Sequence, residues 1–230
     1  MIITQVNPVI RDDEQEVDLV TTGTHQYRLV YKPHMHGGGV DFMNCFSTYI
    51  NAKYPGRQFT NCLEWCAGPG FIAHHLLDLE ICQNIYLMDH YQPLESYWAL
   101  NKSANSLSDR VKTQIADKIS DIPSTEKFDL VVSNPPHFKS FNSYNTSMMG
   151  PEDWYDGNCE RLCVDQDWLT HLEFFNSIGN YLNPNAVILL VEHTANVPDL
   201  VPLMEGKFTA LQDHFSESYD KLLFLNLTKI

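Results

Sequence analysis

Residues 64–70 of this 230-residue chain read Glu-Trp-Cys-Ala-Gly-Pro-Gly and follow an apolar run of strand length. Gly68 and Gly70 allow the backbone to turn sharply and leave room for a ligand to lie against it. Glu64 brings a carboxylate beside the turn, where negative charge favours a cationic ligand. The segment therefore predicts a ligand site at the carboxyl end of a strand.

A second acid, Asp89, ends the next apolar run, roughly 20 residues past the glycines, where a carboxylate accepts ribose hydroxyls. The full G-x-G-x-x-G fingerprint is missing, so an NAD-dependent oxidoreductase is only a distant alternative. S-adenosylmethionine has a sulfonium, an ammonium and a ribose, and it suits both acids. The competing interpretation is an ordinary strand-to-helix turn with acids nearby.

The segment 129–138, Asp-Leu-Val-Val-Ser-Asn-Pro-Pro-His-Phe, is the most specific in the chain. Two consecutive prolines make a stiff turn that donates no N–H, and they restrict the backbone of Asn134. Such a turn presents two acceptors, the Asn134 side-chain oxygen and the Pro135 carbonyl. Two acceptors suit a nitrogen that bears two hydrogens, because they aim its lone pair at a methyl donor. His137 or Phe138 could then cover a planar substrate by stacking. The alternative is a turn that only ends a strand.

Short apolar runs alternate with helical patterns from residue 59 onward. The expected strands cover 62–66, 85–89, 111–116, 128–132, 186–191 and 222–227, and the expected helices cover 71–77, 93–105 and 167–182. This alternation predicts a Rossmann-like, doubly wound α/β sheet with helices on both faces. The last helix is interpreted as amphipathic, with its apolar face formed by Leu169, Leu172, Phe175, Ile178 and Leu182.

Residues 1–58 do not follow this rhythm and are interpreted as an N-terminal extension packed on a ligand-binding domain of residues 59–230. A helix is expected at 41–51. The glycine-rich stretch 34–39 is either a lid over the site or a plain surface loop, and His36 and Gly38 are candidate substrate contacts. His34, His36 and Asp41 lack an evident fourth ligand, so no metal site is expected.

Over about residues 59–230 the chain resembles class I S-adenosylmethionine-dependent methyltransferases with an Asn-Pro-Pro-Tyr motif. That group includes glutamine methyltransferases of translation factors and ribosomal proteins, and adenine or guanine amino methyltransferases. The resemblance implies a sheet of about seven mostly parallel strands with the last strand antiparallel. It implies that Asn134, Pro135 and His137 handle the acceptor nitrogen. The implied cofactor residues are Glu64, Cys66, Ala67, Gly68, Gly70, Asp89, His90, Asp117, Lys118 and Asn134.

Two residues depart from the family pattern. Cys66 stands where the family commonly has its first glycine, and His137 replaces the usual Tyr or Phe after the prolines. An imidazole at that position could stack, hydrogen-bond or act as a weak base. These departures leave open a non-catalytic partner subunit that keeps the fold for binding.

The charge balance bears on the acceptor. Asp and Glu number 29 against 15 Lys and Arg, a net charge of −14, whereas binders of polyanions usually carry a basic face. We therefore expect a protein, peptide or small-molecule acceptor, with nucleic acid as the alternative. The loop from 142 to 164, which contains Trp154, is either a specificity element that touches substrate or an ordinary surface loop.

The apolar runs are too short to cross a bilayer, and no signal peptide is visible at the N-terminus. Six irregularly spaced cysteines, several within apolar segments, are typical of free thiols in a cytoplasmic protein.

Overall fold

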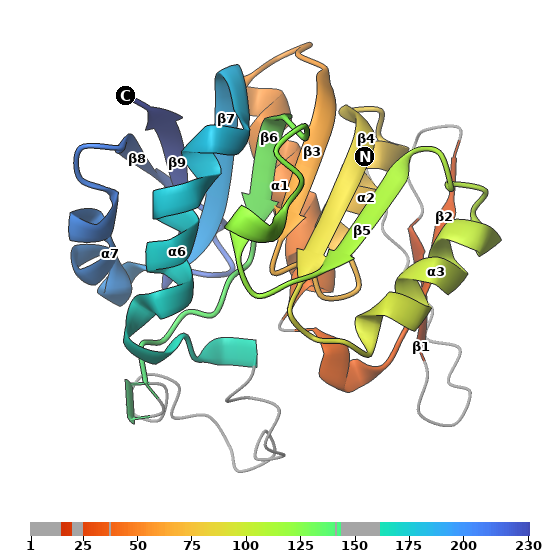
Figure 1. Ribbon diagram of the computed structural model, residues 1–230, viewed down its shortest axis with the longest axis horizontal. Coiled ribbons are helices and arrows are strands. Elements are labelled where there is room, and N and C mark those ends of the chain that lie inside the picture. Colours follow the sequence, from red (N-terminus) through yellow and green to blue (C-terminus); the bar gives the residue numbers. More distant parts are fainter. Residues whose placement is uncertain (1–14, 20–24, 37, 141, 144–161) are drawn as a thin grey trace.

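A seven-stranded sheet forms the centre of the computed structural model, which describes residues 15–19, 25–36, 38–140, 142–143 and 162–230 (Figure 1). The strand order is β5-β4-β3-β6-β7-β9-β8. The pairs from β5 to β7 are parallel, and β9 is antiparallel to both of its neighbours. The predicted Rossmann-like sheet with an antiparallel last strand is confirmed. Its strands are β3 Phe59–Trp65, β4 Cys82–Asp89, β5 Val111–Ile115, β6 Phe128–Ser133, β7 Leu182–His193, β8 Phe208–His214 and β9 Leu222–Lys229.

Helices cover both faces of the sheet. One face packs against α1 Gly39–Lys53, α2 Phe71–Asp78 and α3 Leu94–Ala104. The other packs against η2 Ile119–Asp121, α6 Leu169–Ser177 and α7 Val197–Met204. The short 3-10 helices are η1 Pro33–Met35, η4 Gln166–Trp168, η5 Ile178–Tyr181 and η6 Thr194–Asn196.

The buried stretches of the central strands are mostly apolar because both of their faces are covered. In β6, Leu130 and Val132 belong to the core under α1–α3, while Val131 belongs to the core under α6 and α7. All three are fully buried. Because β3 pairs in parallel with both β4 and β6, the carboxyl ends of the three strands lie at one edge of the sheet, where the glycine turn and the Asn-Pro-Pro turn meet.

The helix expected at 167–182 is partly wrong. Asp167 and Trp168 have φ of 55° and 59°, so the α-helix begins only at Leu169, and residues 178–181 form a 3-10 helix. Leu169 is 62% exposed and Leu172 37%, so two of the apolar positions assigned to the buried face are on the surface. Phe175 and Ile178 are buried as predicted, and His171 and Phe174 complete the buried face of α6.

The N-terminal segment forms a two-stranded antiparallel sheet of β1 Gln15–Leu19 and β2 Tyr27–Tyr31. The outer edge of β2 is satisfied by side chains of α3, because Asn101 and Asn105 each exchange two hydrogen bonds with its backbone. An edge strand closed in this way presents few unpaired groups. The division into units at residue 58 stays a prediction.

Two elements, α7 and β8, were not expected from the sequence. The prolines at 198 and 202 obscure the helical pattern of α7, although Pro198 lies in the first turn, where a missing N–H costs nothing. Strand β8 is an edge strand with mostly exposed side chains and lacks an alternating pattern.

No helix among the described residues is long and apolar enough to cross a membrane. The five cysteines in the described part of the chain, Cys45, Cys62, Cys66, Cys82 and Cys163, are free thiols.

Candidate active site

A cavity of about 410 Å³ lies where the carboxyl ends of β3, β4 and β6 meet. It also receives residues from the N-terminal segment and from the start of α6. Most of the residues singled out in the sequence line it, although the sequence alone could not place them together. Those lining residues are His36, Glu64, Cys66, Ala67, Gly68, Asp89, His90, Asp117 and Asn134.

The glycine turn after β3 has a backbone that few other residues could adopt. Gly68 and Gly70 have φ of 51° and 84°. A Cβ on Gly68 would lie 2.9 Å from the Met35 carbonyl oxygen, and one on Gly70 would lie 2.8 Å from the Leu87 side chain. Cys66 also has a left-handed φ, 53°, a conformation that costs a non-glycine residue about 1–2 kcal/mol. The position where the family commonly has glycine is thus one that favours glycine.

Asp89 is fixed by the turn it faces. Its Oδ2 accepts a hydrogen bond from the Gly68 N–H at 2.8 Å, and its Oδ1 accepts one from the Tyr91 N–H at 3.0 Å. Each oxygen keeps a second lone pair, so the carboxylate can still accept hydroxyl donors from the cavity.

Glu64 lies beneath the turn and is 2% exposed. Its Oε2 accepts a hydrogen bond from the Ala73 N–H in the first turn of α2, at 2.7 Å. Burial raises the pKa of the Glu64 carboxyl to about 8, although the N–H groups of Ala73 and Ile72 oppose the shift. A cation in the cavity would favour the ionised form of this group.

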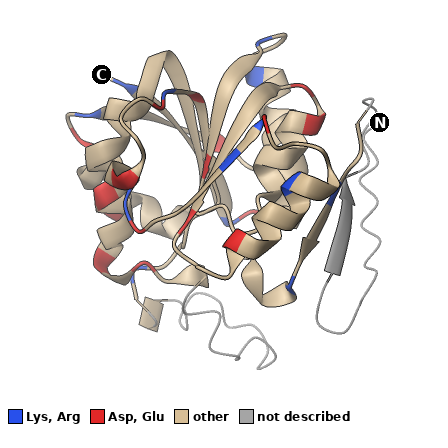
Figure 2. Ribbon diagram, turned by 45° about the vertical axis from the view of Figure 1, so that its right-hand side comes forward, with Lys and Arg blue, Asp and Glu red and all other residues tan. Residues whose placement is uncertain are grey.

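Four acidic residues line the cavity, Glu64, Asp89, Asp117 and Asp165, and none of the described lining residues is Lys or Arg. In Figure 2 the Lys and Arg positions are scattered singly over several elements of the drawn chain. The electrostatics of the cavity therefore favour a cationic ligand.

The Asn-Pro-Pro turn after β6 forms a second wall. Asn134 and Pro136 line the cavity, whereas Pro135 is buried outside its lining. The imidazole of His137 lies with its Nε2 3.0 Å from Asn134 Oδ1. Phe138 is 2% exposed and packs on His193, which argues against the stacking role suggested for it.

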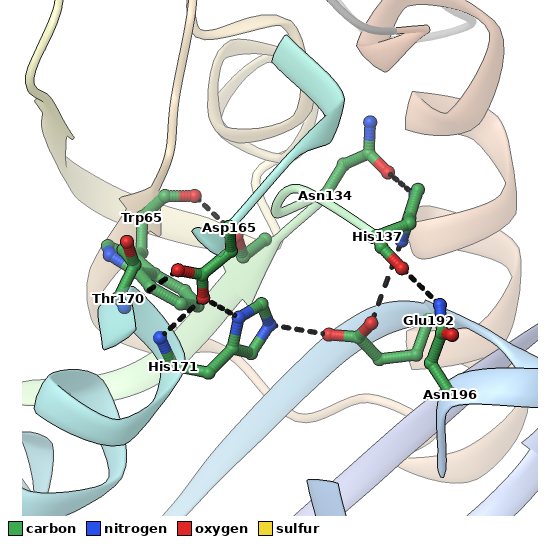
Figure 3. A network of polar contacts seen from close by, with 9 residues as sticks. Trp65, Asn134, His137, Asp165, Thr170, His171, Glu192 and Asn196 are labelled. Carbon is green, nitrogen blue, oxygen red and sulfur yellow. Dashed lines mark hydrogen bonds and ion pairs between the residues drawn. The ribbon is translucent and has the colours of Figure 1, made fainter. Parts of the chain in front are cut away.

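A buried chain of polar groups continues from this turn into α6 and β7 (Figure 3). Asp165 Oδ2 lies 2.7 Å from Nδ1 of His171, whose Nε2 lies 2.9 Å from Glu192 Oε1. Asp165 also accepts from the N–H groups of Thr170 and His171, and so caps α6. Hydrogen bonds with the Phe138 backbone fix Asp165 beside the proline turn.

The three groups of this chain are charged. Burial alone would lower the pKa of His171, but the charges and hydrogen bonds of Glu192 and Asp165 raise it to about 9. Burial likewise opposes ionisation of Asp165 and Glu192, yet the neighbouring groups, His171 above all, lower both pKa values. The sequence analysis missed this network. The available signals were Glu192 in an otherwise apolar strand and His171 within the α6 pattern.

The N-terminal segment completes the cavity. Met35, His36 and Gly39 line it, and the rings of Tyr31 and Phe71 pack edge-on against His36. Burial lowers the pKa of His36.

The remaining predicted site residues lie elsewhere. Gly70, His137 and Lys118 are outside the lining, and Lys118 is exposed. Gly38 precedes α1 with φ 91°, and Trp154 is outside the described residues. No group of three or more His, Cys, Asp or Glu in the described residues is placed to hold a metal ion.

Comparison with known proteins places this geometry in a structural class. No protein-family model matches the chain, and no curated protein matches it in sequence. Among solved structures, the ribosomal protein L11 methylase of Lactobacillus delbrueckii subsp. bulgaricus is similar, with a TM-score of 0.59, 13% identity and coverage of 86% of this chain and 83% of that one. The chain has a methyltransferase fold.

Two further structures share that fold. A methyltransferase from Pyrococcus furiosus has a TM-score of 0.51 and 13% identity, and the match covers 80% of this chain and 81% of that one. SMU.776, determined in complex with SAH (S-adenosylhomocysteine), has a TM-score of 0.57 and 11% identity, with coverage of 96% and 57%. At such identities the likeness establishes the fold, and the chemistry must be argued from the site.

Proposed function

We propose that this protein is an S-adenosylmethionine-dependent N-methyltransferase that acts on an amide or amino nitrogen of a protein, peptide or small molecule. The observation that carries the proposal is the cavity itself: acidic groups at a glycine turn face an Asn-Pro-Pro turn across about 410 Å³. The solved structure of the same fold with SAH supports the choice of cofactor.

Each part of S-adenosylmethionine has residues in the cavity lining that suit its chemistry. Glu64 and Asp117 favour the cationic and amino groups of the cofactor, and Asp89 can accept its ribose hydroxyls. The turn of Cys66 to Gly68 lets the ligand lie close to the backbone. His90 lies beside Asp89 at the same edge.

Asn134 supplies the acceptor side. An amide oxygen that accepts an N–H of the acceptor would orient the nitrogen lone pair toward the sulfonium methyl, and positioning is the main requirement of this reaction. The N–C bond forms as the C–S bond breaks, the sulfonium becomes a neutral thioether, and the methylated nitrogen then loses a proton to water.

The first experiment is calorimetric titration of the purified chain with S-adenosylmethionine and with SAH. Micromolar binding of either supports the cofactor assignment. Absence of binding to both would overturn it and would favour the non-catalytic partner subunit that Cys66 and His137 suggest.

The second experiment replaces Asn134 with Ala and follows labelled methyl transfer to a panel of peptides, amides and amines. We expect transfer to fall by at least about 100-fold, because the positioning group is lost, while calorimetric affinity for the cofactor is kept. Asn51→Ala is the control, since Asn51 is exposed on α1 and lies outside the cavity lining. Undiminished transfer by the Asn134 variant would refute the proposed role.

Nucleic acid remains the second acceptor class. The acidic cavity and the net charge of −14 argue against it, because binding to phosphates depends on Lys and Arg. A filter-binding assay that detected tight, salt-sensitive affinity for RNA or DNA would reverse this ranking.

A further inference from the structure

The side chain that contacts Asn134 is itself held between two groups. His137 Nε2 lies 3.0 Å from Asn134 Oδ1, and its Nδ1 lies 3.6 Å from Glu192 Oε2 (Figure 3). Its carbonyl oxygen accepts a hydrogen bond from the Asn196 side chain, which anchors the residue to η6. The imidazole therefore bridges the cavity wall and the buried charges of β7.

Two atoms in this bridge are left without hydrogen-bond partners. Nδ1 of His137 and Oε2 of Glu192 are both buried, lack a hydrogen-bond partner among the described residues, and face each other at ion-pair distance. Their separation exceeds the usual N–H···O range of about 2.7–3.2 Å, so a movement of under an ångström would pair them. An unpaired buried donor or acceptor costs about 1–3 kcal/mol, which favours that pairing.

The charge on Glu192 limits which nitrogen of His137 carries a proton. Glu192 is fully buried, and its other oxygen accepts a hydrogen bond from His171 Nε2 at 2.9 Å. A lone pair on Nδ1 would face the carboxylate and be repelled, whereas an N–H would donate to it. A neutral His137 then has its lone pair on Nε2, facing the Asn134 amide.

We propose that Glu192 is a positioning residue that selects the Nδ1–H form of His137 and, through it, the orientation of the Asn134 amide. A bare Nε2 accepts a hydrogen bond from the amide nitrogen of Asn134. Rotation of the Asn134 amide by a half turn places its NH₂ group against Nε2 of His137. The amide oxygen then occupies the end that Figure 3 shows pointing away from His137. That oxygen is the acceptor a substrate N–H requires.

His171 extends the arrangement to the other side of the cavity. It holds Glu192 ionised and also contacts Asp165, which lines the cavity and caps α6. The orientation of Asn134 is thereby linked to the start of α6. The catalytic consequence rests on the methyl transfer proposed above, whereas the link from Glu192 to the proton on His137 does not depend on it.

The test is nitrogen-15 NMR of the histidine rings at about pH 8, where unperturbed histidines are neutral. His137 is assigned by comparison with a His137→Gln variant. We expect the proton on Nδ1 in the wild-type protein. In Glu192→Gln, a neutral amide replaces the carboxylate that favours an N–H on Nδ1, so the proton should move to Nε2, which lies 3.0 Å from Asn134 Oδ1.

Glu173→Gln is the matched control. Glu173 lies on α6 but accepts its hydrogen bonds from the N–H groups of Ile119 and Ser120, away from His137. We expect this variant to keep the wild-type form of His137. Should Glu192→Gln fail to fold, Asn134→Asp gives an independent test: two carboxylates would then flank the imidazole, and both of its nitrogens should carry protons.

The inference would be overturned if His137 in the wild-type protein carried its proton only on Nε2. It would also be overturned if the His137 ring were unchanged in Glu192→Gln, or if His137 in Asn134→Asp carried a proton on Nε2 alone. Titration with S-adenosylmethionine separates this result from the proposed function. Glu192 does not line the cavity, so Glu192→Gln should bind the cofactor as the wild type does. If the His137 ring is unchanged in Glu192→Gln while S-adenosylmethionine still binds, only this inference is removed. If the wild-type protein does not bind S-adenosylmethionine, only the proposed function is removed.

Discussion

On the β3–β4 side of the cavity, Glu64 and Asp89 are held by backbone N–H groups, whereas on the β6–β7 side Asp165 and Glu192 are held by a protonated side chain, His171. The first pair has no counter-cation among the described residues lining the cavity. In the second pair the charge of His171 compensates one of the two carboxylate charges within the protein.

The different partners of the two pairs of acids suit them to different functions, ligand binding for the first pair and positioning for the second. Acidic groups that face no Lys or Arg are suited to binding a cationic ligand, because the cation favours the ionised form of Glu64, whose pKa burial raises to about 8. A compensated ion network is instead suited to holding neighbouring groups, here His137 and Asn134, in one geometry. Four experiments test this contrast between the two sides of the cavity.

The largest expected effect is on stability. His171→Leu removes the only side-chain cation shown to contact both Asp165 and Glu192 in the described structure and leaves both carboxylates buried. We expect the free energy of unfolding in urea to fall by about 3–5 kcal/mol. His75→Leu is the control: His75 is equally buried, but its side chain contacts the neutral Ser47 hydroxyl, so about 1–2 kcal/mol should be lost. Equal losses would contradict the ion network.

These two histidines should also respond to pH in opposite directions. The pKa of His171 is raised to about 9, so its contribution to stability is fully present below its ordinary value of about 6.5 and is lost as the pH rises through 9. Burial lowers the pKa of His75 to about 4, so its folded state loses stability as the pH falls from about 6.5 to 4. Unfolding curves of each variant against the wild type measure both trends.

The second experiment alters the glycine turn. Gly68→Ala should lower stability by about 2–4 kcal/mol and weaken cofactor binding, because the residue combines a left-handed φ with a contact to the Met35 carbonyl. Gly206→Ala is matched in backbone, with φ 73°, but a Cβ there meets no atom within 4 Å. It should cost only about 1–2 kcal/mol. Identical costs in chemical denaturation would argue that η1 does not restrict the turn.

The third experiment tests Glu64 by the pH dependence of cofactor affinity. With its pKa raised to about 8, the carboxyl must lose a proton when a cation binds below that pH. Wild-type affinity for S-adenosylmethionine relative to Glu64→Gln should therefore rise by up to about tenfold per pH unit toward 8 and then level off. Both proteins bind the same ligand, so titration of the ligand amino group affects both affinities equally and drops out of their ratio, which calorimetry measures at each pH. A constant ratio would show that Glu64 does not meet the cation.

The smallest effect is expected for Cys66→Gly. Relief of the left-handed strain and the greater freedom of glycine in the unfolded chain oppose each other, so stability should change by less than about 1 kcal/mol. Cofactor affinity measured by calorimetry should be kept. A large loss of affinity would instead show that the thiol takes part in binding.

The sheet and the short segments that form the site could be predicted from the sequence. The alternation of apolar runs and helices predicted the parallel sheet, because strands buried on both faces must be apolar throughout. The glycine turn, Asp89 and the Asn-Pro-Pro turn were recognisable since each is a short segment with a restricted backbone. The choice of acceptor, the cytoplasmic location and the roles of the site residues stay predictions.

Only the tertiary structure decided how those pieces meet. The contact of Met35 with Gly68 joins residues that no local pattern relates. His171 and Glu192 are 21 residues apart on different elements, and their pairing depends on how α6 lies against β7. A helical pattern alone placed Leu169 in the core, but α6 begins only after the left-handed residues Asp167 and Trp168, and it buries His171 while Leu169 is exposed. Such ion pairs arise from packing across the sheet, which periodicity along the chain does not encode.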